Sequence, residues 1–502
     1  MIRSFFLLLL FAACAVPARG QGESGEPHPR EDRFFAVVLS DEERAAYEFL
    51  ADDRKAAFRR KHWGRLDPTP ASEENEREME HQRRVVEAID RFRDRSGRFV
   101  WDDRAKAWIR FGRPAGIEFL RGALEGDTFV PPREAWRYDG ALFWFEDREL
   151  SGAYRFGDGE GALPATADTR RRVETGEGFA WDVMGEEDPA AARARALAAF
   201  SLDSTGVGIR TREGLEWWER VPERNEHASP PSELVLEPSV SVFGRPDSLS
   251  SVLIGVGIPA GPLGRAREVD SGRSSMRIEM RTALRDSTFS VAATGRKEII
   301  LDVAPGVEPP LRLVAVDSLV SEPGPYRLAI AVEDLAGGGG GVFEADIDVP
   351  DFTDGSMRMS DLLFAEKATT DFRQKGPVRR GDYRIDPRPD RAFRKGERVY
   401  VYFELHGVKP DRDGRFYTEI VFSLSSESGA PFSARFGGTE KGRLSEGSAA
   451  EIGNVSRASS SVHAIAIETS GLSPGAYALV IEARDLSSGE QARGAGRFIM
   501  QE

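Results

Sequence analysis

The segment GPYRLAIAVEDLAGG, residues 324–338, recurs without a gap as GAYALVIEARDLSSG, residues 475–489. The two copies share glycine at both ends, tyrosine at the third position and an Asp-Leu pair before the closing turn. An alternating apolar pattern precedes each copy, SSVLIGVGIP at 250–259 and ERVYVYFELHGV at 397–408. A repeated segment with shared strand patterning indicates tandem copies of one structural unit.

The sequence around these motifs is typical of β-sandwiches. Short strand patterns recur roughly every ten residues, separated by Gly, Pro and Ser. The sequence therefore predicts two tandem Ig-like β-sandwich modules, at 239–350 and 397–502, with a linker and lead-in strand at 351–396. In both copies of the repeat, we expect the tyrosine to pack inward with its hydroxyl bonded to the backbone.

The first half of the chain has a different composition. All eight tryptophans lie between Trp63 and Trp218, and none occurs in the second half. This break indicates a separate kind of domain at 31–220, followed by a polar, proline-bearing linker at 221–238. The predicted fold class is therefore multidomain, with an α+β domain followed by all-β modules.

Helix signals open this first domain. Ser40 and Glu43 fit a capping box, and the apolar residues after them keep helical spacing as far as Trp63. A second amphipathic helix is predicted at 72–95. A third is predicted to begin at Asp188, where a capping residue precedes proline.

The stretch RFVWDDRAKAWIRFGRPAGIEF, residues 98–119, is predicted to form two strands with a polar connection. Gly112, Arg113 and Pro114 form the expected turn before the second strand. Together with the alternating aromatic residues at 135–156, these strands predict a small antiparallel sheet on which the helices pack.

The adjacent carboxylates Asp102 and Asp103 raise the question of catalysis. Neighbouring residues in a strand point to opposite faces, and paired-carboxylate hydrolysis needs two groups that flank one bond. We therefore expect a structural role, in which Asp102 or Asp103 bonds backbone amides in a turn and pairs with Arg104 or Lys106. No residue is predicted to be catalytic.

Aromatic residues on the predicted sheet allow two interpretations, because they can form the core or, as the second interpretation, a binding face. The second interpretation includes a partner protein, a peptide or a glycan as the ligand. The binding candidates are Trp101, Asp102, Asp103, Arg104, Arg113, Trp136 and Tyr138.

The first twenty residues predict export. A short basic start and a compact apolar run precede Ala18-Arg19-Gly20, which fits a signal peptide at 1–20 cleaved before Gln21. The run is too short to span a bilayer, and no later run is long enough. Phe11-Ala12-Ala13-Cys14 approximates a lipoprotein box, so lipid anchoring at Cys14 remains an alternative.

Charge and motif content exclude several classes of partner and site. The net charge of −14 argues against nucleic acid and anionic membrane surfaces. Cys14 is the only cysteine, so a mature chain without it has neither disulfides nor cysteine-based metal sites. The six histidines are scattered without a metal-binding motif, and no dinucleotide loop precedes a helix. We predict no metal and no cofactor.

The chain contains, in this order, the motifs AFRRKHWGRLDPTP, SEENE, RRVVEAIDRF, DDRAKAWIRFGRP, WRYDG, MSDLLFAEK and VYFELHGV. In wording and order these motifs resemble the GWxTD domain family. The resemblance implies a bacterial exported protein with a domain of unknown function. The naming motif falls at residues 99–103, where only its final aspartate, Asp103, is kept.

These observations predict an exported cell-envelope protein, periplasmic or extracellular, with a non-catalytic binding or scaffolding role. Its expected partners are envelope proteins or glycans. The alternative is a hydrolase with a polar site between the helices and the sheet, using His62, Asp67, Asp103 or Arg104. A concave pocket where these groups converge would favour the enzyme.

Overall fold

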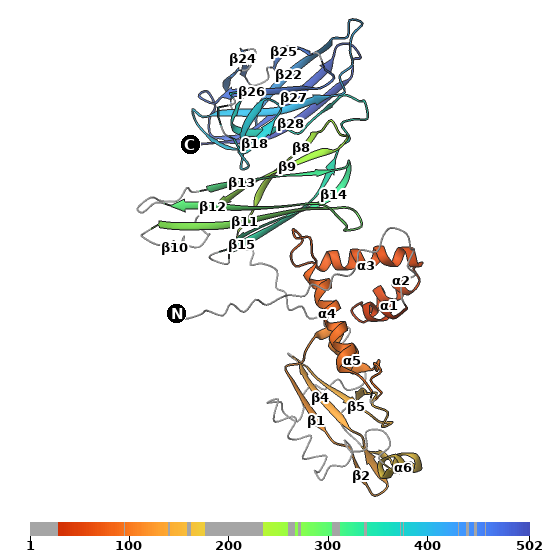
Figure 1. The fold of residues 1–502 in the computed structure, drawn as a ribbon. Coiled ribbons are helices and arrows are strands. Elements are labelled where there is room, and N and C mark those ends of the chain that lie inside the picture. Colours follow the sequence, from red (N-terminus) through yellow and green to blue (C-terminus); the bar gives the residue numbers. More distant parts are fainter. Residues whose placement is uncertain are drawn as a thin grey trace, which may run out of the picture.

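The structure is a computed structural model. It describes residues 29–175 and 234–502, apart from short gaps at 95, 139–140, 158–161, 260–266, 270–272, 304–311, 336–338, 372, 375, 430, 438–440, 446–448 and 457. An α+β domain is followed by two stacked β-sandwiches (Figure 1). The predicted signal peptide with Cys14 and the predicted helix from Asp188 lie outside the described residues, as does most of the predicted linker at 221–238.

Six helices belong to the described part of the α+β domain. They are α1 (Pro29–Ala36), α2 (Asp41–Glu48), α3 (Asp52–Leu66), α4 (Glu76–Arg91), α5 (Asp103–Phe111) and α6 (Ala167–Thr175). The predicted capping box is confirmed, because the Ser40 hydroxyl accepts the Glu43 amide and the Glu43 carboxylate accepts the Ser40 amide. The single helix predicted after it is two helices, α2 and α3. The predicted helix at 72–95 is confirmed as α4, with Asn75 as its N-cap.

The prediction of a strand at AWIRFG, residues 107–112, is wrong, since residues 103–111 form helix α5. Asp102 caps the helix, and its side chain accepts the Ala105 amide. Gly112 ends it with a φ of 72°, a backbone conformation that favours glycine. The alternation of Ala107, Ile109 and Phe111 suggested a strand, but all three are buried because α5 is covered on most of its surface.

The sheet of this domain is antiparallel, as predicted, and has the order β1-β4-β5-β6. Its strands are β1 (Gly116–Leu120), β4 (Arg133–Tyr138), β5 (Ala141–Glu146) and β6 (Arg155–Gly157). A smaller sheet contains β2 (Ala123–Glu125), β3 (Thr128–Val130) and β7 (Leu163–Pro164). The larger sheet packs on α5 and the end of α4, where Trp136 contacts Trp108, Phe92 and Phe145.

The first sandwich packs a three-stranded sheet against a larger one. The smaller sheet is β13-β9-β8, with β8 (Glu237–Gly244), β9 (Ser250–Pro259) and β13 (Arg312–Ser321). In the other sheet, β11 pairs with β12 and β14, and β14 pairs with β15. Its strands are β10 (Arg267–Val269), β11 (Arg273–Arg285), β12 (Val291–Val303), β14 (Gly324–Asp334) and β15 (Gly340–Val349).

The second sandwich repeats this topology. Strands β17 (Leu363–Thr369), β21 (Arg398–His406) and β26 (Ser461–Glu468) correspond to β8, β9 and β13. The facing sheet pairs β22 with β25 and β27, and β27 with β28. Its main strands are β22 (Phe416–Ser426), β25 (Ala449–Ser456), β27 (Gly475–Asp485) and β28 (Gln491–Gln501). The matching pairings confirm the prediction of two tandem Ig-like sandwiches.

Residues 351–396 contain more strands than the predicted linker with one lead-in strand. Within this segment lie β16 (Arg358–Met359), β17, β18 (Val378–Arg380), β19 (Tyr383–Pro387) and β20 (Ala392–Arg394). Strand β17 pairs with β21, and β20 pairs in parallel with β28. The sheet containing β21 is further extended by β23 (Ser433–Gly437) and β24 (Lys441–Ser445). The second sandwich therefore includes most of the segment predicted to be a linker and lead-in strand.

The repeated tyrosines bond the backbone as expected. Tyr477 donates to the carbonyl oxygen of Ser473 at 3.0 Å, and Tyr326 donates to that of Glu322 at 3.0 Å. Both acceptors lie four residues earlier in the chain. The glycine two residues before each tyrosine has nearly the same φ, 148° and 145°, so the two copies of the repeat begin in the same way.

Replacing Tyr477 with phenylalanine should destabilise the second sandwich by about 1–2 kcal/mol. The ring is fully buried, and its hydroxyl also accepts the Ser473 amide at 3.0 Å, so the variant leaves both backbone groups without this partner. Urea unfolding would measure the change. Tyr326→Phe is the matched control, with a smaller loss expected because that residue is only half-buried. An unchanged midpoint for Tyr477→Phe would contradict the structural role.

The two sandwiches share an apolar interface. The interface cluster consists of Phe243, Leu253, Val316, Leu363, Ala365, Val378, Ile385 and Tyr402. The first three come from β8, β9 and β13, and the others come from the sheet of the second sandwich that contains β21. The Asp361 carboxylate also accepts the amide of Val242 at 2.8 Å, so polar contacts fix the same junction.

The α+β domain docks on the first sandwich through the tip of the β11–β12 hairpin. Arg285 donates to Asp67 at 3.0 Å and to the carbonyl oxygens of Pro70 and Ser72. Phe289 packs against Gly64 of α3, where an added Cβ would lie 2.3 Å from the ring. Only glycine at this position allows the helix and the hairpin to approach so closely.

Candidate functional site

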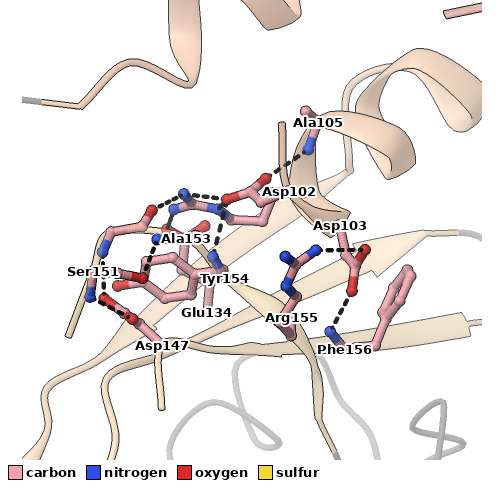
Figure 2. Close-up of polar contacts among 12 residues, drawn as sticks. Asp102, Asp103, Ala105, Glu134, Asp147, Ser151, Ala153, Tyr154, Arg155 and Phe156 are labelled. Atoms are coloured by element: carbon pink, nitrogen blue, oxygen red, sulfur yellow. Dashed lines mark hydrogen bonds and ion pairs between the residues drawn. The ribbon is translucent and has the colours of Figure 1, made fainter. Parts of the chain in front are cut away.

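Asp102 is the buried centre of the predicted site. One carboxylate oxygen accepts the Ala105 amide at 3.1 Å and so caps α5. The other accepts the Tyr154 amide at 3.0 Å and two bonds from Arg104, at 2.7 and 2.9 Å (Figure 2). The side chain is wholly buried. The carboxylate therefore joins the start of the helix to the segment before β6.

Arg104 extends this cluster to the sheet. Its guanidinium pairs with Glu134 at 2.7 Å and donates to the carbonyl oxygen of Gly152 at 3.0 Å. The same group lies 3.8 Å from the centre of the Tyr154 ring, a favourable cation–π position. The Trp136 indole donates to the other oxygen of Glu134 at 2.7 Å. Three predicted candidates, Asp102, Arg104 and Trp136, are thus brought together in one buried network. Asp103 follows Asp102 in sequence but makes separate contacts.

Asp103, like Asp102, accepts a backbone amide near β6, but the donor is two residues further along the chain. Asp103 accepts the Phe156 amide at 2.9 Å (Figure 2). It also pairs with Lys106 at 2.8 Å. Arg155 lies 3.9 Å away. The contacts predicted for the two aspartates, with backbone amides and with Arg104 and Lys106, are all present. They fasten a helix to a strand, however, whereas we expected a turn between two strands.

Glu134 and Asp147 are parts of this network that sequence reasoning missed. Asp147 is buried and accepts the amides of Ser151 and Gly152 at 3.0 and 2.8 Å, which shapes the loop that Arg104 contacts. Burial raises the pKa of the Asp147 carboxyl. The Ser151-Gly152 pair, four and five residues after Asp147, is a turn signal that could have located this loop. Glu134 offers no comparable local signal.

A groove of about 620 Å³ opens beside the exposed side of this cluster. It lies between α1, α2, the start of α3 and the start of α5. Its lining residues are Asp32, Arg33, Ala36, Val37, Arg44, Tyr47, Glu48, Lys55, Trp101, Asp103, Lys106 and Phe156. Two predicted candidates, Trp101 and Asp103, therefore face a cavity large enough for a ligand or for a partner side chain.

The walls of the groove are held by charged and aromatic contacts. The Arg33 guanidinium lies 5.0 Å from the Trp101 ring and contacts Phe34 and Phe99 as well. Also in the groove, the Tyr47 hydroxyl donates to Asp32 at 2.6 Å. Burial and this hydrogen bond raise the pKa of Tyr47. The groove thus combines both signs of charge with aromatic surface on ordered side chains.

Trp136, Tyr138 and Arg113 do not line the groove. Trp136 and Tyr138 are buried in the core, so the first of the two interpretations of the aromatic residues is correct for them and they offer no binding surface. Tyr138 donates to the carbonyl oxygen of Gly112 at 2.8 Å. Arg113 is exposed at the end of α5 opposite Asp102 and Asp103.

The residues considered for a hydrolase have separate surroundings. His62 packs edge-on against Phe35 and Trp63, and burial lowers the pKa of its imidazole. Asp67 pairs with Arg285 of the first sandwich, whereas Asp103 faces the groove. In the described ranges, no group of three or more His, Cys, Asp or Glu residues is arranged to hold a metal ion. Nor is any helix there long and apolar enough to cross a membrane.

The buried His81 makes the stability of this domain sensitive to acid. Burial and the positive charges of Arg77 and Arg84 lower the pKa of His81 to about 3. Its ring lies 4.9 Å from that of Trp63. Because the unfolded chain takes up the proton near pH 6.5, stability is fully present above that pH and is lost as pH falls toward 3. We expect a loss of about 3 kcal/mol at pH 4 from this group.

Denaturant unfolding at pH 7 and pH 4 would test this expectation. In His81→Gln, the acid-dependent loss in the α+β transition should shrink, whatever the cost of the substitution itself. His463→Gln is the matched control, because burial lowers the pKa of His463 to about 4 in the second sandwich. That variant should leave the acid response of the α+β domain unchanged. An equal pH dependence in His81→Gln and the original chain would show that His81 is not the cause.

Comparisons with known proteins identify no relative by sequence. No family description and no curated protein matches the chain. Among solved structures, the chain is similar to the crystal structure of red sea bream transglutaminase, at 10% identity and a TM-score of 0.15. The match covers 82% of this chain and 45% of that one, so this chain spans less than half of its length. The assignment of the sandwiches therefore depends on their strand pairings, and membership of the GWxTD family stays a prediction.

Proposed function

We propose that this protein is exported to the cell envelope and binds a protein partner there through the groove beside Trp101 and Asp103. The α+β domain carries the binding site, and the two sandwiches hold it in a fixed position. Export rests on the signal-peptide pattern of the first twenty residues and on the resemblance to exported GWxTD proteins.

The observation that carries the proposal is the engagement of both aspartates. Each carboxylate binds a backbone amide of the 154–156 segment together with at least one cation. A general acid or nucleophile must instead present an oxygen to a substrate. The groove above them offers charged and aromatic walls, which suit recognition better than catalysis.

A second observation favours a protein as the partner. Phe49 is 92% exposed at the end of α2, directly after Glu48, which lines the groove. A large aromatic side chain left in water contributes little to the fold but much to an interface, because it offers a wide apolar area to bury. Phe49 and the groove together make a surface with an apolar anchor and polar surroundings, as protein interfaces have.

The test compares capture by surface variants. The full chain without residues 1–20 is immobilised and exposed to a solubilised envelope extract, and bound proteins are quantified by mass spectrometry. We expect a defined protein to be retained by the original chain and lost, by about tenfold or more, with Phe49→Ser or Glu48→Lys. Both side chains are exposed, so the fold should persist.

Val235→Ser is the matched control, because Val235 is 81% exposed on the first sandwich, away from the groove. It should retain the partner fully. Loss of the partner with Val235→Ser, or equal capture by all variants, would contradict the groove as the binding site. Capture of a glycan without any protein would keep the site but reject the proposed class of partner.

A further inference from the structure

A second cavity lies at the other end of α5. It has a volume of about 350 Å³ and is formed by α4 and the C-terminal turn of α5. Its lining residues are Arg83, Arg84, Glu87, Arg91, Trp108, Gly112 and Arg113. Since α5 has nine residues, this arginine pocket is separated from the start of the helix by about 13 Å along the axis.

The arginine pocket is strongly positive on a negative protein. Four arginines and one glutamate give its lining a formal charge of +3, against −14 for the whole chain. The glutamate is already bound on both oxygens, by Arg83 at 3.0 Å and by the Trp108 indole at 3.1 Å. In the described part of the chain, Arg91 and Arg113 have no carboxylate partner. The pocket therefore has a surplus of cationic donors.

The floor of the arginine pocket is fixed by packing. Arg84 is 1% exposed and donates to the carbonyl oxygen of Arg110 at 3.1 Å, and it also pairs with Glu80. A Cβ at Gly112 would lie 3.0 Å from the Arg84 guanidinium, so glycine is needed both for this space and for the positive φ.

The wall and rim of the pocket are exposed. Arg91 lies 4.8 Å from the centre of the Trp108 ring, which holds its guanidinium against the wall by a cation–π contact. Arg113 follows Gly112 and is exposed at the rim. A ligand entering the pocket would meet these two guanidinium groups before it reached the buried Arg84.

We propose that the arginine pocket binds a multivalent oxyanion, such as a phosphate ester or a polycarboxylate. The planar guanidinium matches two oxygens of phosphate or carboxylate at once, and charge-assisted bonds of this kind are the strong ones. The volume lies within the range of small-ligand sites. This site is separate from the groove, and the proposal does not depend on the proposed partner protein.

Calorimetric titration of the full chain without residues 1–20 at low ionic strength tests the proposal. Inorganic pyrophosphate and citrate are the probes, and sodium chloride at equal ionic strength is the reference. We expect one saturable site per chain, with affinity at least about tenfold lower in the double variant Arg91→Ala/Arg113→Ala. Tighter binding of pyrophosphate than of citrate would identify phosphate as the ligand chemistry, and the reverse would identify carboxylate.

The charge-matched control is Arg98→Ala/Arg121→Ala, because both of these arginines are exposed in the same domain and neither lines the pocket. This control should keep the original affinity, and so should Phe49→Ser, next to the groove residue Glu48. Equal weakening by the two double variants would show a general charge effect and overturn the proposal. Absence of saturable binding by either probe would also overturn it.

Discussion

Replacement of Asp102 with alanine is expected to lower the unfolding free energy of the α+β domain by about 3–5 kcal/mol. The substitution removes the cap of α5, the bond to the Tyr154 amide and the carboxylate that pairs with Arg104. Arg104 would remain inside the domain, with 12% of its side chain exposed and only Glu134 to balance it. Leaving a buried charge partly unpaired is among the costliest single changes in a folded protein.

Chemical denaturation followed by tryptophan fluorescence would measure this loss, since all eight tryptophans lie in the first half of the chain. Asp102→Asn separates the two contributions, because the amide oxygen can still cap the helix while the charge is gone. Its loss should be smaller than that of Asp102→Ala. Equal stability of Asp102→Ala and the original chain would contradict the central place of this carboxylate.

Replacement of Arg285 with alanine is expected to detach the α+β domain from the first sandwich. Arg285 is the buried cation between Asp67 and the carbonyl oxygens of Pro70 and Ser72. Without it, the wholly buried Asp67 carboxylate would face the sandwich unpaired, a cost of about 3–5 kcal/mol to this interface. Because burial raises the pKa of Asp67 to about 6, the comparison belongs at pH 8, where the group is ionised.

Small-angle scattering would report an increase in the radius of gyration, and limited proteolysis would report faster cleavage near the interface. Arg277→Ala is the matched control, because Arg277 is on the same strand β11 but pairs with Glu298 at an exposed position. That variant should scatter like the original chain. An unchanged radius of gyration for Arg285→Ala would show that other contacts, such as Phe289 on Gly64, are enough to hold the two units together.

The two sandwiches were predictable because their signals are local. Alternating apolar residues, turn residues and the Gly-x-Tyr repeat each depend on neighbours in sequence. The predicted strand at 250–259 has the bounds of β9. The linker predicted within residues 351–396 was less accurate. Strand β17 belongs to a sheet only through its pairing with β21, about forty residues later.

The error at α5 has a physical cause. Over nine residues, Ala107, Ile109 and Phe111 fit a two-residue period, while Ala105, Trp108 and Ile109 fit a helical one. A helix covered on most sides carries apolar residues on both patterns, so periodicity alone cannot decide. The aspartate before Asp103-Arg104-Ala105 was a usable N-cap signal.

The hydrogen-bond partners of Asp102 and Asp103 were predicted better than the secondary structure around them. Backbone amides and nearby cations are the usual partners of paired aspartates near a bend, and Arg104 and Lys106 are close in sequence. Tyr154, Phe156 and Glu134 are thirty or more residues away, and only tertiary packing selects them. The groove likewise depends on how α1, α2 and α3 pack against α5, and the arginine pocket depends on how α4 packs against α5. No local pattern encodes either arrangement.

The interface cluster between the sandwiches has a mechanical consequence. Two modules joined only by a flexible linker would let the α+β domain take many orientations relative to the C-terminal end. Modules that share the interface cluster, with the Asp361 carboxylate bonded to the Val242 amide, move together as one rigid unit. The distance of the groove from the C-terminal end is then set by the chain itself, and under the proposed function a partner would meet the groove at that fixed distance.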